Sequence, residues 1–340
     1  MPSSSRHETD AVVVGAGPVG LFTVFELGMV RMQAHVADVL DAIGGQLTAL
    51  YPEKPIYDIP GFPKVLAADL VDRLAEQAAP FNPRYHLGVK VDRLVKLPDG
   101  RWDVGLSDGT AIVAKVVLIA AGAGAFGPNR PPLEGLEAYE GKSVFYYVKR
   151  RDDFAGKRVV IAGGGDSAVD WALSLSEVAA KVMVVHRRPK FRAAPESEAQ
   201  LKALADAGKI ELVVPYQLHS LQGQNGKLDA VVVATMEGET RALEADVLLP
   251  FFGLASNLGP IAQWGLEMDG STIKVDPATL ATNLPGVFAL GDVASYTGKM
   301  KLILQGFSEA AMAAQAAHAA AHPGEALHFV HSTSLGVPTA

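Results

Sequence analysis

Residues 11–20 read AVVVGAGPVG, and this stretch decides the fold. Four apolar residues with strand character lead straight into a GxGxxG turn, and the helix-like run LFTVFELGMV follows at 21–30. A second short apolar segment, AHVA at 34–37, ends at Asp38. The order strand, glycine turn, helix and strand predicts a βαβ unit over residues 10–38 that binds a dinucleotide.

Each position of this first turn has a physical role. Gly15 permits the tight turn, Gly17 lets the backbone approach a pyrophosphate, and Gly20 lets the helix pack closely on the strand. The helix that begins near Pro18 offers free N–H groups and a positive dipole end to the phosphates. Asp38, 23 positions after Gly15, can accept hydrogen bonds from ribose hydroxyls. The alternative reading is a glycine-rich turn without a ligand.

A second unit of the same design runs from Lys157 to Arg188. Its turn has the GxGxxA form, and no acid ends its second strand; a cluster of basic residues stands there instead. Guanidinium groups at this place suit a 2′-phosphate, so the unit is predicted to prefer NADPH to NADH. The alternative is a solvated basic loop. The predicted NADP-binding residues are Gly163, Gly164, Gly165, Asp166, Ser167, Ala168, His186, Arg187, Arg188 and Arg192.

The predicted fold class is α/β, with two Rossmann-like, three-layer ββα dinucleotide-binding domains. Glycine- or turn-rich crossovers near 122–124 and 283–286 suggest that residues 123–285 form an inserted NADPH domain, and that residues 1–122 and 286–340 form the first domain. Further strands are expected at 115–121 and 246–252, hairpins at 87–106 and 228–244, and a final helix at 307–321.

Composition narrows the class of function. The 340 residues are 49% hydrophobic, carry a net charge of −7 and contain no cysteine. The missing thiols exclude disulfide chemistry and thiolate metal sites, and no metal site is predicted. The charge makes a nucleic-acid partner unexpected. No apolar run reaches membrane-spanning length, and the polar start MPSSSRHETD lacks a signal-peptide core, so we expect a cytoplasmic protein without membrane contact.

Several motifs in a fixed order carry a family resemblance. They are GAGPVG, Asp38, the GGQL turn at 44–47, GGGDSA, HRRPKFR at 186–192 and ALGDV at 289–293. Along nearly its whole length the chain resembles bacterial thioredoxin reductase. Residues 50–63 and the tail segment HSTS at 331–334 make it most similar to the thioredoxin-reductase-like branch of ferredoxin–NADP+ reductases.

The resemblance implies an FAD site in the first domain and a homodimer. Tyr51 would stack on one face of the flavin, and His331 of the partner subunit's tail would lie over the other. Taken alone, Asp292 reads as an ordinary turn or capping aspartate. The implied FAD-binding residues are Gly15, Gly17, Pro18, Gly20, Asp38, Gly45, Gln46, Leu47, Tyr51, Val91, Phe126, Asp292 and Thr333.

One departure from thioredoxin reductase decides the predicted activity. That family has a CxxC pair just before the second glycine turn, whereas this chain reads FYYVKR at 145–150. Without a dithiol, electrons must leave the flavin directly, which favours a one-electron carrier, ferredoxin or flavodoxin, as the partner. Because ferredoxins are typically acidic, a basic docking patch is expected, with Lys149, Arg150, Arg151, Lys299 and Lys301 as candidates.

Two alternative functions share all these nucleotide motifs. One is an NADPH-dependent flavin oxidase, or a reductase of quinones or other small molecules. The other, from a different class, is a non-catalytic flavin sensor. Motifs for cofactor binding do not name the electron acceptor, so sequence alone leaves these alternatives open.

Overall fold

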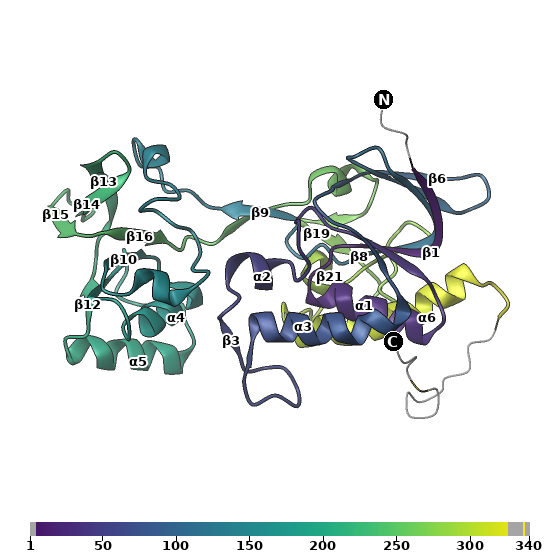
Figure 1. Cartoon of the computed structure of the whole chain (residues 1–340), viewed down its shortest axis with the longest axis horizontal. Helices are drawn as coiled ribbons and strands as arrows, with labels where there is room; N and C mark the ends of the chain where they lie inside the picture. Colours follow the sequence, from purple (N-terminus) through teal and green to yellow (C-terminus); the bar gives the residue numbers. More distant parts are fainter. Residues whose placement is uncertain (1–4, 326–335, 337–340) are drawn as a thin grey trace. The chain divides into compact units, whose positions relative to one another are not determined.

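The computed structural model describes residues 5–325 and 336. The chain divides into two compact units (Figure 1). Unit 1 comprises residues 1–126 and 256–340, and unit 2 comprises residues 127–255. Each unit is an α/β structure around a parallel sheet, as the two βαβ patterns predict.

The main sheet of unit 1 has the strand order β5-β2-β1-β8-β7-β6, with β20 also paired to β8. The strands β5, β2, β1, β8 and β20 run parallel, while β7 and β6 extend the sheet in antiparallel fashion. The bounds are β1 Arg6–Val14, β2 Ala34–Ala37, β5 Arg84–His86, β6 Val91–Lys96, β7 Trp102–Leu106, β8 Ala111–Ile119 and β20 Val287–Ala289.

The strand β1 shows why this sheet lies at the centre of unit 1. Its residues Ala11 and Val13 pack into one core, and Val12 and Val14 pack into another. Alternate residues of a strand point to opposite faces, so an apolar run such as AVVV suits a strand covered on both sides. Helices α1 (Pro18–Met29) and α6 (Ile303–Ala321) share the first core. Helix α3 (Ala67–Ala78) packs beside α1.

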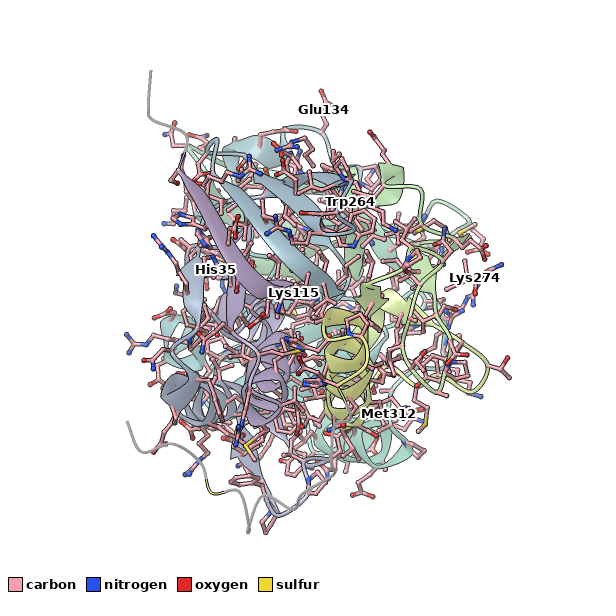
Figure 2. The ribbon with its side chains drawn as sticks, turned by 90° about the vertical axis from the view of Figure 1, so that its right-hand side faces the viewer. His35, Lys115, Glu134, Trp264, Lys274 and Met312 are labelled. Atoms are coloured by element: carbon pink, nitrogen blue, oxygen red, sulfur yellow. The ribbon has the colours of Figure 1, made fainter. Side chains whose placement is uncertain are left out.

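Smaller elements complete unit 1. The short helix α2 (Gln46–Leu50) leads to a two-stranded ribbon of β3 (Pro55–Ile56) and β4 (Val65–Leu66). A three-stranded sheet joins β18 (Met268–Asp269), β19 (Thr272–Lys274) and β21 (Ala294–Ser295). Figure 2 shows the side chains, with His35 on β2, Lys115 on β8 and Met312 on α6.

Unit 2 repeats the design with fewer strands. Its parallel sheet has the order β12-β11-β10-β16, accompanied by helices α4 and α5, and a separate antiparallel sheet has the order β13-β14-β15. The bounds are β10 Arg158–Ala162, α4 Asp166–Leu175, β11 Lys181–Val185, α5 Pro195–Asp206, β12 Ile210–Val213, β13 Gln217–Gln224, β14 Lys227–Ala234, β15 Thr240–Glu244 and β16 Val247–Pro250.

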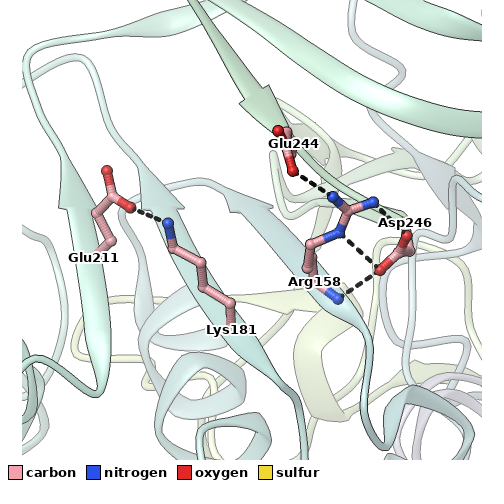
Figure 3. A network of polar contacts seen from close by, with 5 residues as sticks. All are labelled: Arg158, Lys181, Glu211, Glu244 and Asp246. Carbon is pink, nitrogen blue, oxygen red and sulfur yellow. Dashed lines mark hydrogen bonds and ion pairs between the residues drawn. The ribbon is translucent and has the colours of Figure 1, made fainter.

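Ion pairs link side chains of neighbouring segments in unit 2 (Figure 3). Arg158 at the start of β10 binds Asp246 and Glu244. On the neighbouring strands, Lys181 of β11 pairs with Glu211 of β12 at 2.7 Å. These side chains are partly exposed, from 28% for Glu211 to 84% for Glu244, so the pairs contribute little to the stability of the unit.

The two passages between the units pair with each other as strands β9 (Ala125–Pro128) and β17 (Leu254–Asn257). The second passage therefore comes about 30 residues before the crossover expected at 283–286. Residues 256–285 belong to unit 1 because Ile261 and Ile273 are buried in its core, and Ile273 pairs with Ala294. Pairing with a distant strand is not visible in local sequence patterns.

Most elements expected from the sequence are present, with shifted ends. The final helix starts at Ile303 instead of residue 307, and the strand expected at 115–121 spans Ala111–Ile119. Both expected hairpins are confirmed, the first as β6 and β7 and the second as β14 and β15. Among the described residues no helix has the length and apolar character needed to cross a bilayer.

Candidate functional site: two glycine turns

A cavity of about 330 Å³ opens in unit 1 at the carboxyl ends of β1, β2 and β8. Ligands of open α/β sheets bind at this place, because the loops that leave parallel strands gather there. Ten of the FAD-binding residues expected from the sequence line it: Gly15, Gly17, Pro18, Asp38, Gly45, Gln46, Leu47, Tyr51, Val91 and Asp292.

Close backbone contacts shape the first glycine turn. A Cβ atom on Gly20 would lie 1.9 Å from the carbonyl oxygen of Gly15, so α1 can pack this closely on the turn only with glycine there. On the cavity side, a Cβ on Gly45 would lie 3.0 Å from the Cα of Gly17. Gly20 itself does not line the cavity. It sets the path of the turn, whereas Gly15 and Gly17 present backbone to the cavity.

Asp38 holds the turn and the end of β2 together. Its Oδ2 accepts a hydrogen bond from the backbone N–H of Ala16 at 2.6 Å, and its Oδ1 accepts one from Leu40 at 2.8 Å. Burial raises the pKa of Asp38, and hydrogen bonds from the backbone of Leu40, Ala16 and Val39 offset part of that effect. Asp38 lines the cavity, and a carboxylate is the kind of acceptor that ribose hydroxyls need.

Tyr51 and Asp292 come from distant parts of the chain and line the same cavity. Tyr51 ends the short helix α2, and Asp292 follows β20. Burial raises the pKa of both side chains, and the Asp292 charge raises that of Tyr51 further. Lys299 and Lys301 partly counter the effect of burial on Asp292. Together with Asp38, the site therefore offers one tyrosine ring and two half-buried carboxyls to a ligand.

Part of the cavity wall is formed by residues that the sequence did not predict. The additional lining residues include Lys90, Ala121, Gly122, Leu258, Pro260, Lys301 and Ile303. Residues 258–261 were assigned to the other domain, and only their long-range packing reveals their position. Of the remaining expected residues, Thr333 and His331 lie outside the described residues, and no side-chain position is described for Phe126.

The second glycine turn, in unit 2, has a different environment. A Cβ on Gly163 would lie 3.0 Å from the Cβ of Ala168, so alanine already fills the third motif position. A Cβ on Gly165 would meet nothing within 4 Å, which leaves the backbone at the start of α4 open for a phosphate group. A Cβ on Gly164 would lie only 2.2 Å from the imidazole of His186.

The basic loop of unit 2 is tied to this glycine turn. Arg192 donates its backbone N–H to the carbonyl of Gly164 at 2.6 Å, and Ala194 donates to the Oδ1 of Asp166 at 2.9 Å. Arg187, Arg188 and Arg192 are all exposed. Burial lowers the pKa of His186, and the three arginines lower it further. The loop therefore presents guanidinium groups beside the turn, and Asp166, the first residue of α4, anchors it.

The structure contradicts one expectation for the docking patch. The Lys299 side chain is only 7% exposed and pairs with the buried Glu309 at 2.5 Å, so it cannot contact a protein partner. Lys149, Arg150 and Lys301 are exposed as expected. Arg151 is half-buried and pairs with Glu177 at 2.7 Å.

One group of possible metal ligands occurs in the described part of the chain. Ligand atoms of His318, His322 and Glu325 lie within 4.8 Å of one another at the end of α6. The ammonium group of Lys115, on β8 (Figure 2), lies 3.0 Å from Nε2 of His322. A positive charge at this position opposes a second cation, so we assign no metal chemistry to the group.

Fold and site together define an α/β protein with two dinucleotide-binding turns, an acid at the first and arginines at the second. The chain belongs to the pyridine nucleotide-disulphide oxidoreductase family, whose model matches residues 9–321.

Two ferredoxin–NADP reductases are similar to this chain over nearly its whole length. A ferredoxin–NADP reductase of Paramagnetospirillum magneticum is 70% identical over 98% of this chain and 99% of its own. One of Rhodospirillum rubrum is 60% identical over 99% of both chains. Among solved structures, the thioredoxin reductase of T. acidophilum has a TM-score of 0.79 at 26% identity, over 92% of this chain and 98% of its own. The fold class expected from the sequence is thus confirmed.

Proposed function

We propose that the protein is an FAD-dependent ferredoxin–NADP reductase. FAD occupies the cavity of unit 1, and NADP(H) binds at the glycine turn of unit 2. The relatives at 60–70% identity that carry this name support the activity. The absence of cysteine supports it independently, because disulfide reduction would require a thiol pair.

The observation that carries the proposal is the opposite charge at two equivalent positions. In unit 1 the strand after the glycine helix ends at Asp38, which is bonded to the turn. In unit 2 the corresponding strand is followed by His186, Arg187 and Arg188. The loop that contains them is hydrogen-bonded to the second glycine turn through Arg192. An acid accepts ribose hydroxyls, whereas guanidinium groups bind a 2′-phosphate. One unit thus suits FAD and the other NADPH.

The residues of the chain bind and orient the cofactors. Gly15 and Gly17 give the FAD pyrophosphate access to backbone N–H groups, and Asp38 and Asp292 accept hydroxyl hydrogen bonds. When bound there, FAD would supply a hydride acceptor for NADPH and a one-electron donor for the carrier protein. No side chain has to act as acid, base or nucleophile, because hydride transfer moves no separate proton.

Several finer points belong to the same proposal. Tyr51 stacks on one face of the flavin, and the partner subunit's tail, with its copy of His331, covers the other in a homodimer. Flavodoxin can replace ferredoxin as carrier, and the protein works in the cytoplasm. The exposed residues Lys149, Arg150 and Lys301 attract an acidic carrier.

Anaerobic spectroscopy of the purified protein tests the proposal. We expect a flavin spectrum that bleaches on addition of NADPH, and much more slowly with NADH. Added ferredoxin should then become reduced and should stimulate NADPH-driven reduction of cytochrome c. Bleaching without stimulation by any ferredoxin or flavodoxin would favour a quinone or small-molecule reductase. A flavin that stays oxidised would favour a sensor.

A further inference from the structure

A buried polar network lies directly behind the cavity of unit 1. Glu309, in the middle of α6, is 1% exposed, and both of its carboxylate oxygens are used. Its Oε1 accepts hydrogen bonds from the hydroxyl of Tyr296 at 2.6 Å and from the ammonium of Lys299 at 2.5 Å. Its Oε2 accepts the backbone N–H of Gly291 at 2.7 Å.

The last of these bonds reaches the cavity wall. Gly291 has φ 73°, a left-handed conformation that glycine adopts without strain, and Asp292 follows it into the cavity. Gln305 donates to the hydroxyl of Tyr296 at 2.7 Å, so α6 contacts the network at a second point. Glu309 is thus the acceptor that ties the 291–292 corner to the long helix behind it.

The stability of unit 1 does not by itself require a buried ion pair between Glu309 and Lys299. Removing two charges from water is costly, and replacing a buried pair by apolar side chains of equal volume is often neutral or stabilising. An apolar pair, however, would leave the N–H of Gly291 buried without an acceptor. The hydrogen bond from Gly291 to Glu309 therefore fixes the position of the 291–292 corner, which apolar packing alone would not do.

We infer that Glu309 is a positioning residue for FAD: it holds the corner at Gly291 so that Asp292 meets the cofactor correctly, while Lys299 and Tyr296 hold the Glu309 carboxylate in place. This inference rests on the proposed FAD site. Its consequence is a loss of FAD affinity when the acceptor at position 309 is removed, even where charge balance is retained.

Two double variants, both without the charges at positions 299 and 309, test the hydrogen-bond acceptor at position 309 alone. Lys299→Met with Glu309→Gln removes both charges, and the glutamine oxygen can still accept the N–H of Gly291 while its amide donates to Tyr296. Lys299→Met with Glu309→Leu also removes both charges but offers no acceptor. The measurement is the Kd for FAD, from flavin fluorescence after dilution of the holoprotein, with thermal unfolding of the flavin-free protein beside it.

We expect the leucine double variant to bind FAD at least 10-fold more weakly than the glutamine double variant. Its flavin-free form should still unfold cooperatively, a few degrees lower than that of the glutamine double variant, because the N–H of Gly291 has lost its acceptor. We also expect the glutamine double variant to stay within about 3-fold of wild type, since one neutral hydrogen bond replaces a charged one. Equal FAD affinity in the two double variants would overturn the inference, because the pair would then serve packing alone.

Two further measurements complete the test. If the leucine variant does not fold, Glu309→Asp keeps the charge for Lys299 but shortens the reach to Gly291, and it should release FAD at least 5-fold faster than wild type. An unchanged release rate would overturn the inference. Lys181→Met, in the exposed pair of unit 2 (Figure 3), should leave the Kd for FAD within 2-fold of wild type. Wild-type protein that binds no FAD would refute the proposed function instead.

Discussion

The two glycine turns have the same design but different surroundings. In unit 1 the turn forms part of a cavity of about 330 Å³, where the backbone of Gly17 faces Gly45 across a close contact. In unit 2 a Cβ atom on Gly165, just before α4, would meet nothing within 4 Å. An enclosed turn suits a cofactor that stays bound, and an open one suits a substrate that exchanges at every turnover. Similar motifs can therefore serve different kinetic roles, which are set by what packs around them.

Substitution at the third position of each glycine motif should give the largest difference in the free energy of unfolding between the two turns. Gly20→Ala places a methyl group 1.9 Å from the backbone oxygen of Gly15, and neither group can move aside easily. We expect a loss of about 3–5 kcal/mol in the free energy of unfolding, together with loss of flavin. Ala168→Gly in unit 2 should cost only about 1 kcal/mol, the difference in helix propensity. Chemical denaturation of both variants measures the two values, and equal losses would contradict the packing difference.

The charges beside the turns should control cofactor choice. Replacing Arg187 and Arg188 together with alanine removes two charged partners of the 2′-phosphate. We expect the KM for NADPH to rise about 100-fold, while that for NADH changes less than about 3-fold. Steady-state ferricyanide reduction with each cofactor gives both values. A parallel rise for the two cofactors would show that the arginines are only a solvated loop.

The acid beside the first turn should make FAD binding depend on pH. Ribose hydroxyls favour the ionised form of Asp38, so FAD affinity is complete above the pKa of the cofactor-free protein and falls as the pH drops through it. Burial raises that pKa, so the fall should begin at a higher pH than for an exposed aspartate. Kd values for FAD between about pH 4 and pH 7 test this. Asp38→Asn should bind more weakly at neutral pH and show a flatter profile; an identical slope would remove Asp38 from the site.

The smallest effect is expected for the exposed ion pairs of unit 2. Glu211→Gln weakens the bonds to Lys181 and Arg241, whose side chains are 51% and 46% exposed, and should change the free energy of unfolding by less than about 1 kcal/mol. Glu309→Gln in unit 1 should cost several times more, because it leaves the buried Lys299 without a counter-charge. Urea denaturation of the two variants provides the comparison.

Local patterns predicted much of the molecule. Both βαβ units, both hairpins and ten of the cavity residues were found from strand periodicity, glycine spacing and the family motifs. The sequence patterns did not predict the positions of residues that depend on packing against parts of the chain far away in sequence. Residues 258–261 line the cavity although they lie far along the chain from its glycine turn, and helices α3 and α5 were not expected at all.

By itself the sequence determined the two nucleotide turns and their opposite charges, because both depend on short segments whose residues act within one strand–turn–helix unit. It also excluded thiol chemistry, since the chain has no cysteine. Only the tertiary structure decided that Lys299 is buried against Glu309, and that Glu309 holds Gly291 from behind the cavity. A lysine in a polar loop looks exposed in any local reading. Its burial depends on α6 packing beside that loop, a contact that no local pattern encodes.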